Sequence, residues 1–492
     1  MSTVSVGTIN NELRNQITKI DTLLNAGSVY TNWVEFNCGG LHLNTNYKEV
    51  TVNKKSVSIS GNLIAALRFQ KNGSGQANAF TLTIYYAPEY GDDINIIDNS
   101  IAGTLENAMC SCTLRFGYNI GTQCIATPTY LGSVFDYNVE VQNNILTYTF
   151  TGYSSLATKS SVTFDIDAIE EPTKLSDIIL KVYDTSYTQA FSDKHSGVSA
   201  AQSKFDLEFD NKDNIDSMCV KMTYGGATDV NFFQFLDELL GSARDDYTSG
   251  YATASGGVLH YGEYYYTIDD VNSKSVVRIR RREVRPSSIG STYTFFWGGS
   301  FNKDTGCNMV QNFRTDYKGS INLAMRNAGT TKSYNVDDFG NAVETDSGVN
   351  GTSYAGDFYT AYDVARNNNQ YVLGTQYSYT ATLTTMGIPY DVPIGTYITV
   401  KCIIAQQVHH TSGTYMVTKT EDNVTTNGFN TTWSLVKICD DTGRMFNSEQ
   451  EIVNICKAYH ELDKANRLRK NVRRIDEHTY INVNNGMIMT DQ

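Results

Sequence analysis

The chain has 492 residues, a formal net charge of −13 and an aromatic content of 12%, in which 33 Tyr dominate. This length is enough for roughly two to four domains. A protein that grips nucleic acid by neutralising phosphates needs clustered Lys and Arg, so the acidic balance argues against specific nucleic-acid binding. Abundant Tyr, Asn and Gly favour strands joined by turns over disorder.

The nine Cys residues form an odd count without the paired spacing of a metal site. Cys110 and Cys112 would share one face of a strand, and we expect reduced thiols in a core. The N-terminal segment lacks the basic and apolar regions of a secretion signal, and no apolar run approaches the ~20 residues of a membrane span. We therefore expect folding in the cytoplasm and no stable membrane insertion.

Residues 8–25 predict an amphipathic helix, with Thr8 as its cap and Gly27 just past its end. The apolar stripe of this helix must pack on something, and packing on the chain's own domain is favoured over a contact with a partner or within a trimer. The stripe consists of Ile9, Leu13, Ile17, Ile20 and Leu24.

Residues 33–155 then follow a strand pattern that suits a β-barrel or sandwich. Asn143-Asn144 marks a hairpin, and residues 92–105 predict a short helix with acidic residues in its first turn. The expected strands are 63–69, 79–86, 110–116, 133–141 and 145–151.

A mixed pattern comes next, with helices predicted at 172–183, capped by Thr173, and at 230–240, capped by Asp229. The later strands are expected at 205–209, 218–224, 264–268, 276–284, 397–404, 413–420 and 431–438. Two polar, Gly-punctuated tracts, 245–262 and 337–357, are expected as surface loops.

The C-terminal stretch 448–474 predicts a helix that ends in a basic cluster. We interpret this cluster as a candidate partner-binding arm. It consists of Arg467, Arg469, Lys470, Arg473 and Arg474.

A second basic run lies beside Val276 and Ile279, as expected for a strand with one charged face. A solvated face, or salt bridges to a neighbouring subunit, is favoured over a patch that faces DNA or lipid. The run consists of Arg278, Arg280, Arg281, Arg282 and Arg285.

Metal binding is not predicted. His409-His410 would point to opposite faces of a strand and so could not share one ion. The acidic residues near Asp92 and Asp98 lack the Gly and the closing Glu of a calcium loop, so a solvated helix start is the better interpretation.

No nucleophile or phosphate-binding signature supports an enzyme or a cofactor. The sequence contains no Gly-x-Ser-x-Gly, no Gly-x-x-x-x-Gly-Lys-Ser/Thr and no Gly-x-Gly-x-x-Gly after a strand. Carboxylate pairs abound, but the sequence does not say which are buried together, so a glycan hydrolase stays an alternative.

Three stretches, taken in order, resemble the baseplate hub family of contractile phage tails and related injection machines. In residues 67–118, a strand at Phe80 to Tyr86 precedes a helix and then a strand, Leu114 to Tyr118, that ends in a Gly-aromatic pair. Residues 130–153 are similar to the family's hairpin that leaves the first of two tube-like β-barrels.

The third stretch, 395–437, is similar to the family's closing strands. Here Gly413-x-Tyr415 and Gly428-Phe429 precede a strand that carries Trp433. No lysozyme or peptidase module accompanies these stretches, and the tracts 245–262 and 337–357 have no counterpart in the resemblance.

The resemblance implies a mainly β fold with a few helices (α+β), built from two tube-type β-barrels with small insertions and a helical tail. The implied divisions are an N-terminal helix at 1–30, a first barrel at 31–160, an α+β region with the second barrel at 161–320, an insertion with closing strands at 321–440, and the basic tail at 441–492.

The implied function is structural: a homotrimeric baseplate hub in the virion, assembled in the bacterial host cytoplasm. It would adapt the symmetry of the tail tube to the central spike and leave an axial channel for DNA or the tape-measure protein. Its partners would be the tube protein, the spike, the tape-measure protein and other baseplate proteins.

Edge strands that close the barrels are the interface candidates under this resemblance. A receptor-binding tail fibre remains an alternative, because Tyr-, Asn- and Thr-rich strands also suit glycan binding, although no internal sequence repeat is present. The interface candidates are Phe80, Leu82, Ile84, Tyr86, Tyr397, Ile398, Val400 and Ile403.

Overall fold

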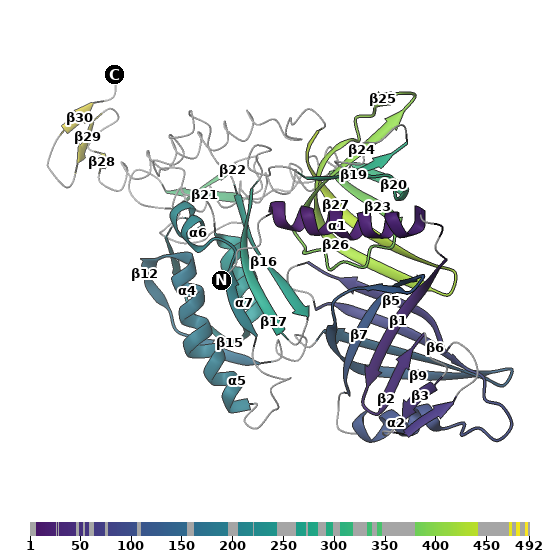
Figure 1. The fold of residues 1–492 in the computed structure, drawn as a ribbon. Helices are drawn as coiled ribbons and strands as arrows, with labels where there is room; N and C mark the ends of the chain where they lie inside the picture. Colours follow the sequence, from purple (N-terminus) through teal and green to yellow (C-terminus); the bar gives the residue numbers. More distant parts are fainter. Residues whose placement is uncertain are drawn as a thin grey trace.

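The structure, a computed structural model, is mainly β with a few helices (Figure 1). Two curled β-sheets and a mixed α/β module each surround a hydrophobic core of their own. No described helix combines the length and the hydropathy needed to cross a membrane. The described residues are 6–25, 27, 29–45, 49–52, 55–58, 63–73, 77–105, 110–154, 162–194, 205–219, 221–243, 262–271, 274–283, 292–298, 306–317, 332–336, 342–346, 379–440, 472–474, 479–482 and 488–490.

The first barrel is an antiparallel sheet in the order β5, β6, β10, β9, β7, β1. Apolar side chains such as Leu82 and Ile84 point into its core, while Thr81 and Thr83 alternate with them, because successive residues of a strand face opposite sides. The strands are β1 (Tyr30–Cys38), β5 (Ile64–Lys71), β6 (Ala79–Tyr86), β7 (Cys110–Ile120), β9 (Tyr130–Gln142) and β10 (Ile145–Ser154).

Shorter elements complete the first barrel. The helix begins four residues later than the predicted 92 and packs through Ile97 and Ile101 on the barrel core. These elements are β2 (Leu41–Asn44), β3 (Glu49–Val52) and β4 (Lys55–Ser58), which continue from β1, β8 (Gln123–Ala126), which pairs with β7, and α2 (Ile96–Leu105).

The second barrel has the order β20, β23, β27, β26, β24, β18. It closes on itself, because β19 pairs with β18 and the chain then continues as β20 to pair with β23. The strands are β18 (Tyr293–Trp297), β19 (Gly306–Cys307), β20 (Val310–Tyr317), β23 (Tyr379–Met386), β24 (Tyr397–Ile404), β25 (Gln407–Val408), β26 (Gly413–Thr425) and β27 (Gly428–Asp440).

The two barrels repeat one topology. Strands β1, β5, β6, β7, β9 and β10 correspond, in both chain order and sheet order, to β18, β20, β23, β24, β26 and β27. The match extends to a bulge between Ile64 and Ala66 and an equivalent bulge between Val310 and Asn312. One difference is that β1 is antiparallel to β7, whereas β18 is parallel to β24.

Strand β26 belongs to both barrels. Its first half pairs with β24, and its second half, from Thr420 to Thr425, pairs with β5 of the first barrel. β26 also contacts β1 of the first barrel, because Asn32 Nδ2 of β1 donates to the Thr425 carbonyl oxygen at 2.6 Å. The barrels are therefore joined by a continuous hydrogen-bonded sheet rather than by a flexible linker.

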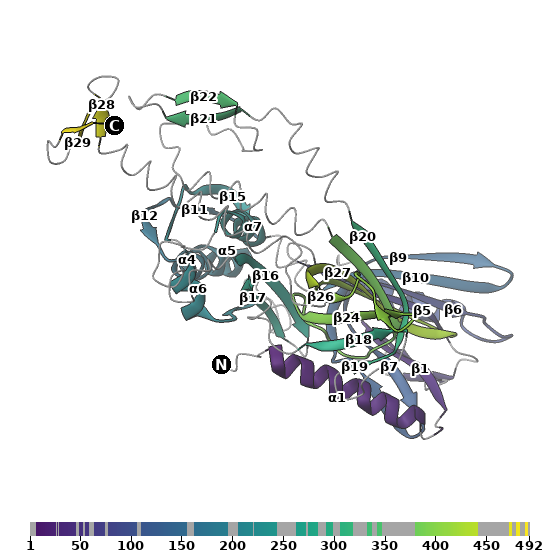
Figure 2. The same ribbon diagram turned by 90° about the horizontal axis from the view of Figure 1, so that it is seen from above.

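Helix α1 (Val6–Asn25) runs along the barrels, as Figure 2 shows. Leu13 and Ile17 are buried in the second core, and Ile20 is buried in the first. The prediction that this helix packs on its own chain is confirmed for these three residues.

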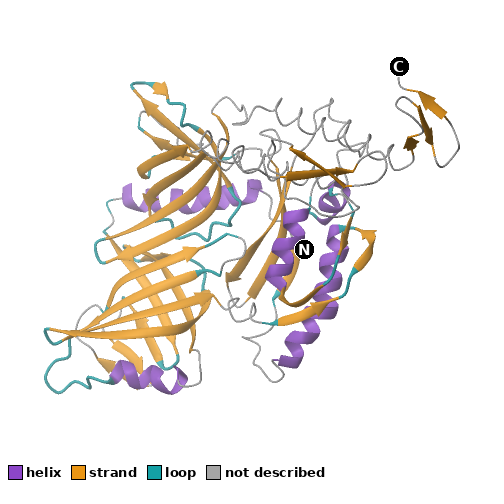
Figure 3. Ribbon diagram, turned by 180° about the vertical axis from the view of Figure 1, so that it is seen from behind, coloured by secondary structure: helices purple, strands orange, loops and turns teal. Residues whose placement is uncertain are grey.

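In the α/β module, β16 and β17 lie between the helices and the barrels (Figures 1 and 3). Helix α4 continues without a break through a π-helical turn into α5. The elements are β11 (Thr163–Ile166), β12 (Ile169–Thr173), α4 (Leu175–Lys181), the π-helix Val182–Tyr187, α5 (Thr188–Lys194), β13 (Asp206–Phe209), α6 (Lys212–Met218), β14 (Met222–Tyr224), β15 (Ala227–Asn231), α7 (Phe232–Ser242), β16 (Gly262–Val271) and β17 (Lys274–Glu283).

Both predicted helix caps in this module are wrong. Asp229 has φ +52°, and the cap of α7 is instead Asn231, whose side chain accepts from the Phe233 and Gln234 amides while Gln234 bonds back. This capping box fixes the helix start two residues later. Helix α4 begins after Lys174, which makes no side-chain cap bond, so Thr173 is not its cap.

The expected divisions also need correction. The second barrel begins at β18 and crosses the boundary at 320, because β18 and β20 share a core with β23 to β27. The described residues between 162 and 283 form the α/β module, with a core of their own. The strand expected at 218–224 is shorter, because α6 occupies the chain up to Met218.

The two polar tracts and the tail lie largely outside the described residues. Within the tract 337–357, β22 (Ala342–Asp346) pairs with β21 (Lys332–Val336). In the tail, β28 (Val472–Arg474), β29 (Thr479–Asn482) and β30 (Ile488–Thr490) form a small sheet. Arg473 and Arg474 are therefore in a strand where a helix was predicted, and residues 441–471 are outside the described residues.

The packing of α1 can be tested by truncation. Ile17→Ala removes a side chain that is 2% exposed, so we expect a loss of about 2–5 kcal/mol in the free energy of unfolding. Thr18→Ala, at an exposed position of the same helix, is the control and should change it by no more than about 0.5 kcal/mol. Chemical denaturation measures both, and equal effects would contradict the packing.

Candidate functional site at the junction of the three modules

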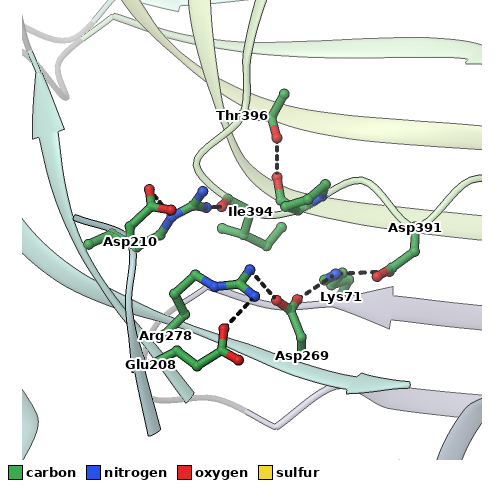
Figure 4. Close-up of polar contacts among 10 residues, drawn as sticks. Lys71, Glu208, Asp210, Asp269, Arg278, Asp391, Ile394 and Thr396 are labelled. Atoms are coloured by element: carbon green, nitrogen blue, oxygen red, sulfur yellow. Dashed lines mark hydrogen bonds and ion pairs between the residues drawn. The ribbon is translucent and has the colours of Figure 1, made fainter. Parts of the chain in front are cut away.

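Three modules meet around the ammonium group of Lys71. This residue ends β5 of the first barrel, and its side chain is buried at 2% exposure (Figure 4). Its Nζ lies 3.2 Å from Asp269 Oδ1 on β16 of the α/β module and 2.8 Å from Asp391 Oδ1, between β23 and β24 of the second barrel. One cation thus contacts a carboxylate from each of the other two modules.

A second residue of the first barrel reaches the same carboxylate. Tyr130 of β9 donates from its hydroxyl to Asp391 Oδ1 at 3.1 Å. Its ring stacks on Phe69 with centroids 4.2 Å apart, which holds the hydroxyl in place. Burial, together with the nearby Asp391, raises the pKa of Tyr130, so the hydroxyl keeps its proton and acts as a donor.

The arginine run of β17 extends the network. Arg278 bridges Glu208 at 3.0 Å and Asp269 at 3.2 Å, and Arg280 lies 3.2 Å from Asp210. The parallel pairing of β17 with β13 brings Glu208 and the following Asp210 beside the arginines, whereas Asp269 lies on β16, the antiparallel neighbour of β17. The sequence suggested a solvated face or salt bridges to a neighbouring subunit, whereas the bridges of Arg278 and Arg280 are within the chain.

Arg280 also connects modules directly. It is 6% exposed, and its Nη1 donates to the Ile394 carbonyl oxygen of the second barrel at 2.9 Å (Figure 4). Burial on its own lowers the pKa of this guanidinium, but Tyr265 and Asp210 outweigh the burial, and the pKa lies above its usual range. Of the other arginines in the run, Arg285 lies outside the described residues.

The charges at the junction compensate one another. Burial favours the neutral forms of Lys71 and Asp269, yet their mutual attraction and the contacts with Asp391 and Arg278 raise the pKa of Lys71 and lower the pKa of Asp269. Both groups therefore stay ionised. A paired, ionised Lys is neither a free base nor a nucleophile, so the arrangement holds surfaces together and fixes their angle.

Asp422 is an acid of this junction that forms no ion pair with the described residues. It lies on β26 opposite Phe69 of β5 and is 6% exposed, with Thr431 Oγ1 donating to its Oδ1 at 2.5 Å. Burial, and then repulsion by Asp391 and Glu421, raises the pKa of Asp422 to about 7, against the opposing influence of Thr431 and Lys71. The strand shared by both barrels thus carries a carboxyl that titrates near neutrality.

Its neighbour Glu421 behaves in the opposite way. Burial alone would raise the pKa of Glu421, but hydrogen bonds from Arg68, Gln70 and Asn423 lower it to about 2. Arg68 contacts Glu421 at 2.8 Å across the β26–β5 ladder and lies on the exposed face. The two faces of this ladder therefore differ: one holds a solvated ion pair and the other a buried acid.

The interface candidates on β6 do not lie at a sheet edge. Strand β6 pairs with β5 on one side and β10 on the other, and Phe80, Leu82, Ile84 and Tyr86 are 0–5% exposed in the first core. The assignment to an edge is wrong, because alternate residues of an interior strand fill the core of their own barrel.

The candidates on β24 are also mostly internal. Tyr397, Ile398 and Val400 are 0–7% exposed, and β24 pairs with both β18 and β26. Ile403 is only partly buried, near the end of the strand where β25 pairs with it, and its role as an interface residue stays a prediction.

The partner-binding cluster of the tail is not assembled in the described residues. Arg467, Arg469 and Lys470 fall outside them, and Arg473 and Arg474 occupy β28. Its role as a binding arm therefore stays a prediction.

His409 and His410 follow β25 in a turn, not in a strand, with ring centroids 4.1 Å apart. Within the described ranges, no group of three or more His, Cys, Asp or Glu is arranged to hold a metal ion. The described cysteines are thiols that form no disulfide with one another, and all except Cys124 are buried, as expected for core thiols.

Sequence reasoning missed Lys71, Asp391 and Asp422. A signal existed for Lys71, which continues the inward alternation of Leu67 and Phe69 and therefore had to be buried. A lysine at an inward position implies an acidic partner, but only the fold identifies Asp269 and Asp391 as that partner.

No family model matches the chain, and no curated protein matches it in sequence. The structure is similar to a 43 kDa tail protein of prophage MuSo2 from Shewanella oneidensis, with 12% identity and a TM-score of 0.44 over 82% of this chain and 98% of that one. It is also similar to a tail protein from Neisseria meningitidis MC58, with 11% identity and a TM-score of 0.44 over 83% and 96%. A type VI secretion component of E. coli covers 76% of this chain and 73% of its own, with 8% identity and a TM-score of 0.37.

The charge network predicts that two cations of β5 contribute very unequally to the free energy of unfolding. Lys71→Met leaves Asp391 without its cation and Asp269 with Arg278 alone, so we expect a loss of about 3–5 kcal/mol in unfolding free energy. Arg68→Met, which removes an exposed ion pair on the same ladder, should cost less than about 1 kcal/mol. Urea titration of both variants measures the difference, and similar costs would refute the role of Lys71.

Asp422 predicts a pH dependence. Folding raises the pKa of Asp422 from its usual 3.8 to about 7, so the folded state loses stability as pH rises from about 4 to 7. Asp422→Asn should therefore be neutral near pH 4 and stabilise by on the order of 2–4 kcal/mol at pH 8.

Glu421→Gln is the matched control with the opposite sign. Folding lowers the pKa of Glu421 to about 2, so this variant should lose stability above about pH 4.5 and match the parent protein below about pH 2. Unfolding curves measured across the pH range follow both variants, and the same pH trend in the two would argue against the assigned environments.

Proposed function

We propose that the chain is a structural component of a phage tail or a related injection machine, acting as the baseplate hub. The observation that carries the proposal is the duplicated barrel: one chain holds two β-barrels of the same strand order, joined by the ladder between β26 and β5. Each copy can thus offer two similar faces in one rigid unit, whereas a single-barrel protein offers one.

Duplication of this kind suits a symmetry adapter. Three copies arranged around an axis would present six similar barrels to a sixfold tail tube and three equivalent sites to a threefold central spike. The adapter needs a fixed angle between its two barrels, which supports a mechanical role for the ion network of Lys71. The N-terminal helix, buried in both cores, would add to this rigidity.

The proposed role is mechanical rather than catalytic. In this proposal a homotrimer sits in the virion baseplate after assembly in the host cytoplasm, and it contacts the tube protein, the spike, other baseplate proteins and the tape-measure protein. The net charge of −13 suits a channel along which DNA passes without binding, because like charges repel.

The hub proposal predicts the mass of the native protein. We expect the purified chain to form a particle of three times 54.7 kDa, with a central opening visible by electron microscopy, alone or on addition of its tube protein. Sedimentation equilibrium over a range of concentrations measures the mass. A monomer under both conditions would remove the proposal.

A further inference from the structure

Strand β9 projects beyond the first barrel. Its first residues pair with β7, but from Asp136 to Gln142 it pairs only with β10 among the described strands. Asn143 and Asn144, with φ of +50° and +62°, make the tight turn at the end of this hairpin. Val139 and Val141 are 39% and 70% exposed on it. A long, partly apolar strand edge of this kind is a template for pairing with another chain.

Strand β20 of the second barrel also has an edge that no described strand pairs with. From Asn312 onwards it pairs with β23 and with no other described strand. Asn312 and Arg314 are exposed, and Phe313 is partly buried against the second core.

The shared topology of the two barrels indicates how these two strand edges could pair. Strand β9 corresponds to β26, and β20 corresponds to β5, and the pair β26 and β5 already forms an antiparallel ladder within the chain. In that ladder Val424 of β26 lies opposite Leu67 of β5, and Val424 is only 2% exposed. The equivalent ladder between β9 and β20 is absent from the described part of a single chain.

The register transfers residue by residue. The hairpin turns align Val141 with Val424 and Glu140 with Asn423. The two bulges align Phe313 with Leu67 and Arg314 with Arg68. Because Val424 pairs with Leu67 and Asn423 with Arg68, the transferred ladder sets Val141 opposite Phe313 and Glu140 opposite Arg314. An apolar pair and an opposite-charge pair both stabilise an antiparallel ladder.

We propose that β9 of one copy pairs in antiparallel register with β20 of a second copy, with Glu140 opposite Arg314 and Val141 opposite Phe313. The inference rests on the proposed function, since it names the surface through which the hub's copies meet. The contact is heterologous: a hairpin tip binds a barrel edge, and each copy supplies both. Barrels around the ring would then be linked alternately by the ladder within a chain and by its equivalent between chains.

Cysteine pairs test the register directly. The exposed Cys124 is replaced by Ser in every variant, and a Glu140→Cys chain is mixed with an Arg314→Cys chain under mild oxidation. Facing residues of antiparallel strands lie within disulfide reach, so we expect a covalent dimer from the mixture and no such dimer from either variant alone. Asn138→Cys mixed with Arg314→Cys, two residues out of register, is the matched control and should link much less.

Charge reversal supplies a second readout in the native assembly. Glu140→Arg or Arg314→Glu alone should weaken self-association at least about tenfold, and the double variant should recover most of the loss. Thermal unfolding of each variant should match the parent chain, because both side chains are exposed in the single copy.

The possible outcomes separate the two proposals. An assembling parent chain that gives no register-specific link, with charge variants that assemble normally, overturns this ladder and leaves the hub proposal standing. A parent chain that neither assembles nor links overturns both. Register-specific linking together with recovery in the double variant supports the ladder.

Discussion

The ladder between β26 and β5 holds the two barrels of the chain together. A strand of the second barrel completes the first, so neither barrel is a separate body. Phe429, the second residue of β27, is buried in the first core, where its ring centroid lies 5.1 Å from that of Tyr118. Backbone bonds and apolar contacts act together here, which fixes the angle between the barrels more firmly than either alone could.

Buried charge adds specificity to this joint. Apolar contacts tolerate sliding, whereas Lys71 needs Asp269 and Asp391 at bonding distance at the same time. A displacement of any one module would leave a charge buried without a partner, and this penalty selects one arrangement. Arg278 and Arg280 of β17 extend the same compensation to the α/β module, so these two residues of a run that suggested an external surface bind within the chain instead.

The duplicated topology connects stability with assembly. Within the chain, β26 pairs with β5. The equivalent strands, β9 and β20, do not pair with each other in the described residues. In the proposed ring, one kind of strand pairing would serve both the folding of a chain and the association of copies. The two barrels share this topology without an internal sequence repeat, although Thr-Leu-Thr occurs at equivalent positions, 81–83 of β6 and 382–384 of β23.

Hydrophobic period and turn chemistry were enough to predict α1, the hairpin at Asn143-Asn144 and many of the barrel strands, namely β5, β6, β7, β9, β10, β24, β26 and β27. Strands β1, β18, β20 and β23 were not predicted from the sequence. It also indicated the mainly β class, through composition and through a resemblance in three stretches. Only the tertiary structure decided which strands are edges, which module each charge belongs to, and that the barrels share β26. The reason is physical: periodicity is set by neighbours along the chain, whereas strand pairing and charge compensation join residues as distant as Lys71 and Asp391, whose meeting no local pattern encodes.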